Sequence, residues 1–377
     1  MEFKDFIEKI DHTIAALGGN LREYPACATG NYLENREKSL PLSSISNWTQ
    51  SFFTGEALLA YAYTGDRKYT DWCERFYGDY YDKVFKTPNQ TMHDLGFLFT
   101  PYAVGLYRLL KEDKMRELGL RAAQVLAMRF DPKSRHIRAW GNMQNELPDD
   151  LPFGDDGSFY LKSDGMAIID CMMNLPLLLW ASETLNHPFY RKIACAHADM
   201  TMHYFIRKDG SVCHAYRFNP ETGAPIGEDN NCGWSVGSHW SRGTAWAVYG
   251  FAILYGYTRD KRYYETSERL AKDFLRLSGG KVPVWDFRLP KSEPQNLDTS
   301  AAAITACGLY ELFRYSKDEK LKNGADGLMA DLERYVNTDP KVMGVLKEQN
   351  GRHYYTCFGD YFYLEALVKR EKDYRVW

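Results

Sequence analysis

Two kinds of helical segment alternate along this chain, and this alternation constrains the fold more than any other feature. Six segments are amphipathic, and six are apolar around most of their circumference. An amphipathic helix covers a core with one face, whereas a helix that is apolar all round must be buried on both sides. The alternation therefore predicts an all-α fold, an (α/α)6 barrel in which six helical hairpins supply an outer and an inner ring.

Each hairpin is marked by a short polar turn between an apolar run and an amphipathic one, as at Thr64–Tyr69 and Thr258–Tyr263. A period of this kind indicates an architecture built from repeats, so we expect residues 1–377 to form a single domain. The amphipathic segments are residues 2–17, 67–84, 113–128, 187–206, 261–277 and 319–336. The apolar segments are residues 49–63, 94–110, 165–184, 240–258, 298–316 and 358–370.

The connections that lead into the apolar segments are long, and we expect them to carry the function. They span residues 18–48, 85–93, 129–164, 207–239, 278–297 and 337–357. All of them precede inner helices, so they gather at the rim where helix N-termini favour an anionic ligand. The alternating stretch Gly210–Phe218 and the turn Asn219–Gly223 predict a short β-hairpin in one of these rim loops.

Charge and motif content exclude several classes of protein. A net charge of -3 without basic runs argues against a nucleic-acid partner, and no stretch is apolar enough to span a membrane. The first ten residues lack the pattern of a signal peptide, so we expect a cytoplasmic protein. The eight cysteines form no Cys-x-x-Cys pair and are interpreted as reduced thiols. Nucleotide-binding and metal-binding motifs are missing, so we expect neither a cofactor nor a metal.

One apolar segment, residues 165–184, contains an acid, Asp170, and an amide, Asn174. We expect Asp170 to lie one to two turns into the sixth helix, where burial disfavours ionisation of its carboxyl. A carboxyl that stays protonated near neutral pH is a candidate proton donor. The alternative is a structural carboxylate that accepts hydrogen bonds from nearby loop amides.

Further polar and aromatic residues stand where the inner helices begin. An acid at a helix start is often only an N-cap, and this alternative stays open for Asp94, Asp298 and Asp360. Arg242 could pair with an inner-ring acid or bind a carboxylate of a ligand. The residues at the helix starts are Trp48, His93, Asp94, Trp240, Arg242, Asp298 and Asp360.

Other candidates lie in the long connections or inside the helices. His214, in the predicted hairpin, could be an ordinary surface histidine. Trp140, Trp234 and Trp246 are either core residues or flat platforms on which a sugar ring stacks.

Five segments together resemble the unsaturated glucuronyl hydrolases of glycoside hydrolase family 88. They occur in the family's order and run through nearly the whole chain. The segments are His93-Asp-Leu-Gly-Phe-Leu98, residues 168–181, Trp240-Ser-Arg-Gly-Thr-Ala-Trp246 with its continuation to residue 250, residues 298–308, and Gly359-Asp-Tyr-Phe-Tyr-Leu-Glu-Ala366. The family has an (α/α)6 fold.

This resemblance implies a catalytic domain that acts on unsaturated uronyl disaccharides or short oligosaccharides. Such an enzyme protonates C4 of a 4,5-unsaturated uronic acid, and hydration of the double bond then releases the neighbouring sugar. The resemblance implies that Asp170 is the general acid and base and that Asp94 supports it. The implied substrate-binding residues are Trp48, His93, Trp140, His214, Arg242, Trp246 and Tyr355.

Two positions depart from the family pattern. Asn231-Cys-Gly233 stands where relatives usually have His-Gln-Gly, and Thr244 stands where they have Gln. These departures concern which sugar, and which sulfation, is preferred. Two alternatives to a hydrolase of glycosaminoglycan-type disaccharides stay open, an unsaturated rhamnogalacturonyl hydrolase acting on pectin fragments and a noncatalytic sugar-binding barrel.

Overall fold

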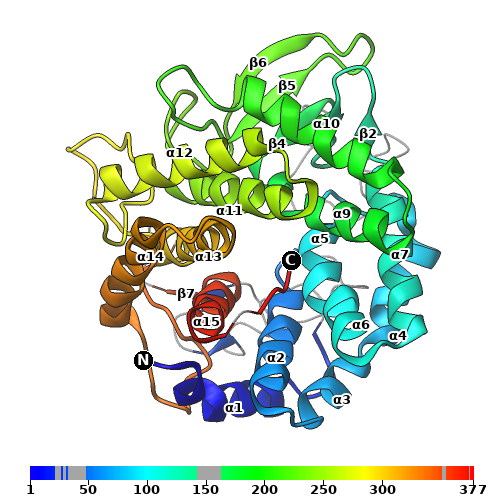
Figure 1. Ribbon diagram of the computed structural model, residues 1–377, viewed down its shortest axis with the longest axis vertical. Coiled ribbons are helices and arrows are strands. Elements are labelled where there is room, and N and C mark those ends of the chain that lie inside the picture. The colour runs from blue at the N-terminus through cyan, green and yellow to red at the C-terminus, as the bar shows by residue number, and fades with distance from the viewer. Residues whose placement is uncertain (22–26, 29–30, 33–47, 142–162, 350–353, 373) are drawn as a thin grey trace, which may run out of the picture.

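The computed structural model describes residues 1–21, 27–28, 31–32, 48–141, 163–349, 354–372 and 374–377. Its helices form an inner and an outer ring around one axis, as predicted for an (α/α)6 barrel (Figure 1). The inner ring consists of α2 (Ser51–Thr64), α5 (Leu95–Phe99) with η5 (Thr100–Val104) and α6 (Gly105–Leu110), α9 (Leu175–Thr184), α11 (Ser241–Thr258), α13 (Thr299–Ser316) and α15 (Cys357–Glu371).

The outer ring is made by the amphipathic segments. It consists of η1 (Phe3–Phe6) with α1 (Ile7–Leu17), α3 (Lys68–Glu74) with α4 (Tyr77–Tyr81) and η3 (Asp82–Lys86), α7 (Asp113–Ala127), α10 (Phe189–Tyr204), α12 (Lys261–Ser278), and α14 (Glu319–Leu332) with η7 (Glu333–Tyr335). In α11 every residue from Ser241 to Leu254 is buried, whereas α12 buries one face only. Burial therefore follows the two sequence patterns that predicted the rings.

No helix in the described ranges combines the length and the apolar character that crossing a bilayer requires. The inner helices are buried by the outer ring and by one another, so their apolar circumference is explained by the barrel.

The third inner segment, residues 165–184, differs from the prediction in the place where Asp170 lies. Residues Met166–Ile168 form strand β4 and Ile169–Met173 form the 3-10 helix η6, so α9 begins only at Leu175. Asp170 therefore lies in a turn ahead of the inner helix, and its predicted position one to two turns inside it was wrong. Pro176 explains the late start, because proline lacks an N–H and is tolerated in the first helical turn.

Short strands connect the rings at the rim. β4 pairs antiparallel with β5 (Ala215–Phe218), and β5 pairs with β6 (Pro225–Asp229), which confirms the predicted hairpin around residues 219–223. Two further pairs join β1 (Cys27–Ala28) to β7 (Tyr355–Thr356) and β2 (Phe130–Asp131) to β3 (His136–Ile137). The short helix η4 (Pro88–Gln90) precedes α5.

The barrel centre is filled from the end opposite the long connections. Trp377 is 1% exposed, and its ring stacks on Phe362 with 6.0 Å between ring centroids. The Trp377 ring also packs edge-to-face with Phe97, with 6.2 Å between ring centroids. The indole N–H of Trp377 donates to Glu365 Oε2 at 2.9 Å. The inner ring is therefore a packed core below the rim and not an open channel.

A close backbone contact joins the turn before α5 to the turn before α9. A Cβ atom added at Gly96 would lie 2.3 Å from Asn174 Cα, a distance that no side chain can occupy. Asn174 Oδ1 accepts a hydrogen bond from Phe97 N at 2.8 Å, which locks the two turns together. Gly96 follows Asp94 by two residues, and Asn174 follows Asp170 by four. The contact thus fixes how far apart the two acids can lie.

We predict that Gly96→Ala lowers the free energy of unfolding by at least the roughly 1–3 kcal/mol typical of an overpacked core, because the Asn174 backbone must move. The measurement is urea denaturation. Gly78→Ala in α4 is the matched control, since a Cβ atom there meets nothing within 4 Å. That control should be as stable as the unmodified protein or slightly more so. Equal stability of the two variants would contradict the close contact.

Candidate active site

Backbone hydrogen bonds at the rim bring the predicted site residues into one layer. His93 N donates to Ala139 O at 3.0 Å, and Ala139 N donates to Met166 O at 2.8 Å. Ile169 N donates to His214 O at 2.9 Å, which continues the layer to the β5–β6 hairpin. Three connections distant in sequence therefore present adjacent residues to the same side of the barrel.

The two acids meet in this layer. Asp94 occupies the N-cap position of α5, but its side chain makes no capping hydrogen bond. Its Oδ1 lies 3.2 Å from His93 Nε2, and Asp170 Oδ2 lies 3.8 Å from His214 Nε2. Asp170 Oδ2 is buried and has no hydrogen-bond partner within the described part of the chain. Neither carboxyl group is thus consumed by capping a helix.

Burial raises the pKa of both acids. It brings the pKa of Asp94 from 3.8 to about 7, and the negative charge of Asp170 adds to this effect. It brings the pKa of Asp170 to about 6, against the lowering influence of the Arg242 charge and the nearby Trp246 indole. Two coupled acids titrate as a pair. The pair therefore holds a proton close to neutral pH, as general acid chemistry requires.

The two histidines are neutral. Burial lowers the pKa of His93 well below its ordinary value and lowers that of His214 to about 3. Asn231 N donates to His214 Nδ1 at 3.0 Å, so the proton of the neutral imidazole is on Nε2. That N–H faces Asp170 and is a donor for a ligand oxygen placed between the two side chains.

Arg242 pairs with an inner-ring acid. Its Nη1 donates to Asp298 Oδ2 at 2.6 Å and to Ser300 Oγ at 3.3 Å, and its guanidinium packs on the rings of Trp240 and Phe358. Asp298 also accepts from Ala301 N, so the N-cap interpretation of Asp298 is confirmed. Binding of a substrate carboxylate by Arg242 stays a prediction.

Asp360 is not a helix cap. The N-cap of α15 is Thr356, whose hydroxyl accepts from Gly359 N at 3.2 Å. Asp360 instead accepts hydrogen bonds from Val345 N at 2.9 Å and Leu346 N at 2.8 Å. The capping interpretation of Asp360 was wrong, because the helix begins earlier and the carboxylate anchors the connection before it.

The predicted aromatic residues fall in three places. Trp48 and Trp246 each lie 5.2 Å from Phe97 by ring centroids, next to the turn that carries Asp94. Trp140 lies 6.5 Å from the His214 ring. Tyr355 lies against a different connection, where its Oη accepts from Asn337 Nδ2 at 2.8 Å. Its role toward a ligand stays a prediction.

The exposure of the tryptophans separates the alternatives left open for them. Trp246 is 0% exposed and belongs to the core beside the site, whereas Trp234 is 43% exposed and is not a core residue. The Trp234 ring packs edge-to-face with the partly buried Trp285, with 6.4 Å between ring centroids.

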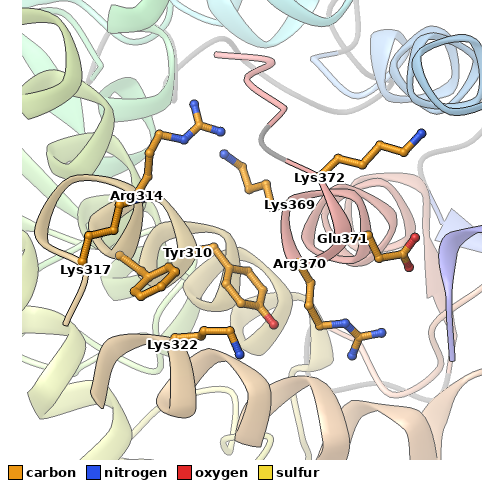
Figure 2. A pocket seen from close by; sticks show the side chains of 9 residues that line it. Tyr310, Arg314, Lys317, Lys322, Lys369, Arg370, Glu371 and Lys372 are labelled. Carbon is orange, nitrogen blue, oxygen red and sulfur yellow. The ribbon is translucent and has the colours of Figure 1, made fainter. Parts of the chain in front are cut away.

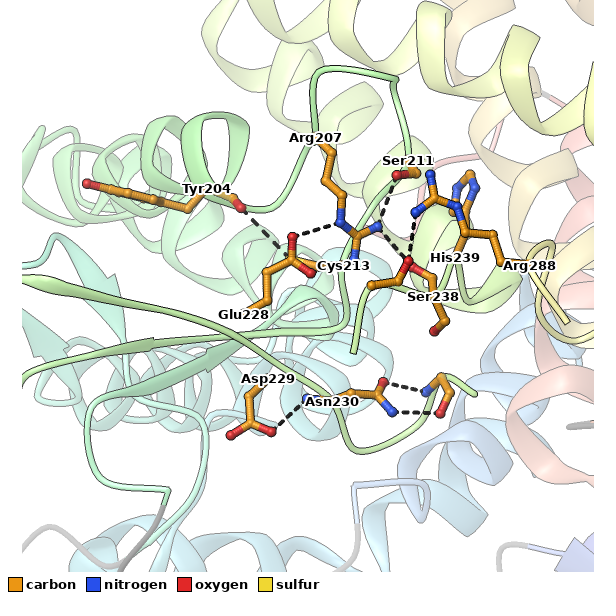
Figure 3. A network of polar contacts seen from close by, with 12 residues as sticks. Tyr204, Arg207, Ser211, Cys213, Glu228, Asp229, Asn230, Ser238, His239 and Arg288 are labelled. Carbon is orange, nitrogen blue, oxygen red and sulfur yellow. Dashed lines mark hydrogen bonds and ion pairs between the residues drawn. The ribbon is translucent and has the colours of Figure 1, made fainter. Parts of the chain in front are cut away.

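A polar network that the sequence did not reveal holds the connection between β6 and α11 (Figure 3). Arg207 donates twice to Glu228, at 2.7 Å each, and once to Ser238 O at 2.9 Å. Asp286 accepts from Trp234 N and His239 N, each at 3.0 Å. The connection carries Cys232, which is exposed. These charges are far apart in sequence, so no local pattern indicated their pairing.

A cavity of about 250 Å³ opens at the opposite end of the barrel, where α13 and α15 end (Figure 2). Basic side chains line it, but Lys369 already binds Glu311 at 2.7 Å and Lys322 binds Asp326 at 2.7 Å. Cations near helix C-termini also stabilise the helix dipoles. We interpret this cavity as structural. Among the described residues, no group of three or more His, Cys, Asp or Glu could hold a metal ion.

The raised pKa values predict how stability depends on pH. Asp94 and Asp170 are protonated in the folded protein but ionised in the unfolded chain between pH 3.8 and about 6–7. Their contribution is therefore fully present below pH 3.8 and is lost as pH rises through 6–7. Asp170→Asn has no carboxyl group to ionise at this position. We therefore predict that, between pH 4 and pH 8, its free energy of unfolding falls by about 1–3 kcal/mol less than that of the wild type. Urea unfolding at both pH values measures it, and identical pH dependence of the two proteins would contradict raised values.

Comparison with known proteins agrees with this fold. The family model of Glycosyl Hydrolase Family 88 matches residues 27–257. The chain is 34% identical over 346 residues to an unsaturated glucuronyl hydrolase of Bacillus sp. strain GL1, covering 88% of each. It is 31% identical over 367 residues to an unsaturated chondroitin disaccharide hydrolase of Streptococcus pyogenes serotype M1, covering 93% of this chain and 86% of the relative.

The folds agree as well. The crystal structure of the unsaturated glucuronyl hydrolase from Bacillus sp. GL1 has a TM-score of 0.84 to this chain at 31% identity, over 98% of this chain and 96% of that one. Sequence and fold lead to the same conclusion: the chain belongs to glycosyl hydrolase family 88 and is a glycoside hydrolase.

Proposed function

We propose that this enzyme removes the 4,5-unsaturated uronic acid from the nonreducing end of lyase-generated oligosaccharides, with glycosaminoglycan-type disaccharides as its main substrates. The single observation that carries the proposal is the pair Asp94 and Asp170, two largely buried carboxyl groups whose pKa values are raised to about 7 and 6. The names of the relatives, an unsaturated glucuronyl hydrolase and an unsaturated chondroitin disaccharide hydrolase, indicate the substrate class.

The reaction begins with proton transfer. Protonated Asp170 gives its proton to C4, the electron pair of the C4=C5 bond forms the new C4–H bond, and the ring oxygen shares the positive charge left at C5. Water then adds to C5 and returns a proton to the Asp170 carboxylate. The resulting hemiketal opens, and the neighbouring sugar leaves. Hydration precedes cleavage, so the distance between the acids does not predict inversion or retention.

Each other site residue has a proposed task. Asp94, next to His93, supports Asp170 as the second acid of the site. The neutral Nε2–H of His214 donates to a sugar oxygen near Asp170, and His93 lies beside Asp94. Arg242 contributes positive charge for the uronate carboxylate. Trp48 and Trp140 give the site aromatic walls, the buried Trp246 supports the site from the core, and Tyr355 completes the proposed binding set.

We predict that Asp170→Asn abolishes turnover, with kcat lowered by roughly a thousandfold or more, because an amide cannot donate the proton. Loss of ultraviolet absorbance of the double bond in an unsaturated chondroitin disaccharide measures turnover. Asp360→Asn is the matched control, since Asp360 is also a buried acid with a raised pKa of about 6. The folded control should keep wild-type kcat. Activity of Asp170→Asn within threefold of wild type would reject the assignment.

Substrate class is tested with the same readout on lyase-generated disaccharides from chondroitin, hyaluronan and pectin. We predict that kcat/KM is highest on a glycosaminoglycan disaccharide, and that Trp140→Ala raises KM about tenfold or more with a smaller change in kcat, because stacking is lost in the bound state. Faster turnover of the pectin fragment would assign the enzyme to the unsaturated rhamnogalacturonyl class. Binding without loss of absorbance would indicate a noncatalytic barrel.

A further inference from the structure

A buried arginine that the proposed mechanism does not use lies beside the site. Arg129 follows α7 and is 2% exposed. Its guanidinium donates to carbonyl oxygens, from Nε to Arg138 O at 2.8 Å, from Nη1 to Thr91 O at 2.5 Å, and from Nη2 to Trp140 O at 2.8 Å and Gly141 O at 3.0 Å. One planar group thus joins four carbonyls on two connections.

These carbonyls belong to segments that carry site residues. Thr91 precedes His93 by two residues and Asp94 by three, and Trp140 is itself a predicted binding residue. The same two connections are joined a second time, because His93 N donates to Ala139 O at 3.0 Å. Arg129 is therefore the point at which the turn of Asp94 and the segment of Trp140 are held together.

The charge of Arg129 is also unusual. No ion pair in the described part of the chain joins it to an acid, and burial lowers its pKa to about 9. A buried cation without an acidic partner is costly, and neutral donors could satisfy carbonyl groups without that cost. The charge does act on Asp94, since it opposes the rise in the pKa of that carboxyl.

Other groups also face Asp94. The buried Lys83 of η3 acts in the same direction as Arg129, and Asp170 of η6 acts against it. His93 is neutral, and burial together with the Asp94 charge raises the pKa of the Cys171 thiol, which is uncharged near neutral pH. Arg129 and Lys83 are thus the cations that act on Asp94, whereas Arg242 acts on Asp170.

We propose that Arg129 is a positioning residue for the reaction: its guanidinium holds the Asp94 turn and Trp140 in register. The proposal rests on the proposed function, because its effects are read in hydrolysis of the unsaturated disaccharide. If the wild-type protein hydrolyses none of the disaccharides, the proposed function fails before Arg129 is tested.

Two variants separate the geometry of the guanidinium from its charge. Arg129→Lys keeps the charge but cannot reach four carbonyls in one plane, so we expect KM to rise about tenfold with an unshifted pH profile of kcat/KM. Arg129→Gln removes the charge as well, so the limb of the profile that belongs to Asp94 should move to higher pH by about one unit. Wild-type KM in both variants and superimposable pH profiles would overturn the proposal.

A matched control and a double mutant distinguish positioning from general stability. Arg108 donates to Tyr257 Oη at 2.6 Å and to Val376 O, near the opposite end of the barrel. Arg108→Lys should change stability without changing KM, and an equal rise of KM in this control would overturn the proposal. If Arg129 acts through Trp140, the double variant with Arg129→Lys and Trp140→Ala should have a KM less than twofold above that of Trp140→Ala alone. A double variant whose KM rises by the product of the two single effects would contradict this.

If Arg129→Gln does not fold, Arg129→Ala is assayed with added guanidinium chloride against sodium chloride at equal ionic strength. We expect kcat/KM of Arg129→Ala to be at least tenfold higher in guanidinium chloride than in sodium chloride, because the free ion fits the space between the carbonyls. Equal activity in the two salts would overturn the proposal.

Discussion

The site depends on the contact between two turns that carry one acid each. Gly96 lies directly against the Asn174 backbone, and the Asn174 amide accepts from Phe97 N. This contact brings the carboxyl groups of Asp94 and Asp170 into mutual influence inside a buried region. Burial raises the cost of ionising both, and the Asp170 charge adds to that cost for Asp94. A proton retained near neutral pH follows from packing, and the proposed reaction needs such a proton.

The rest of the rim keeps this pair in place. The β4–β5–β6 sheet carries His214 to within 3.8 Å of Asp170, and the network around Arg207 and Asp286 stabilises the neighbouring connection. Below the pair, Phe97 and Trp377 fill the barrel axis. The acids therefore lie at the boundary between a dense core and a rim built from irregular segments.

Much of the fold could be predicted from the sequence, because ring membership follows from which faces of a helix are apolar. The twelve segments, the β-hairpin after His214 and the capping role of Asp298 are confirmed by the structure. The local environment of Asp170 was predicted wrongly, because an apolar run has the same composition as a buried strand and as a buried helix. Pro176 was the signal for the helix start.

The contacts that organise the site could not be predicted from the sequence. Arg129 and Asp360 bind backbone groups many residues away, and backbone groups carry no sequence signal. Tyr32, which donates to Asp360 at 2.6 Å, is separated from it by most of the chain. The region 142–162, which belongs to one of the long predicted rim connections, lies outside the described residues.

The most direct test of the central claim is an infrared titration of the carboxyl groups, as the difference between wild type and Asp170→Asn. The protonated carboxyl stretch absorbs apart from the carboxylate, so the difference isolates Asp170 and its coupling to Asp94. The account predicts a protonated band that persists above pH 5 and disappears between about pH 6 and 7. A difference band that is already lost at pH 4 would show that the acids ionise normally, and it would contradict the account.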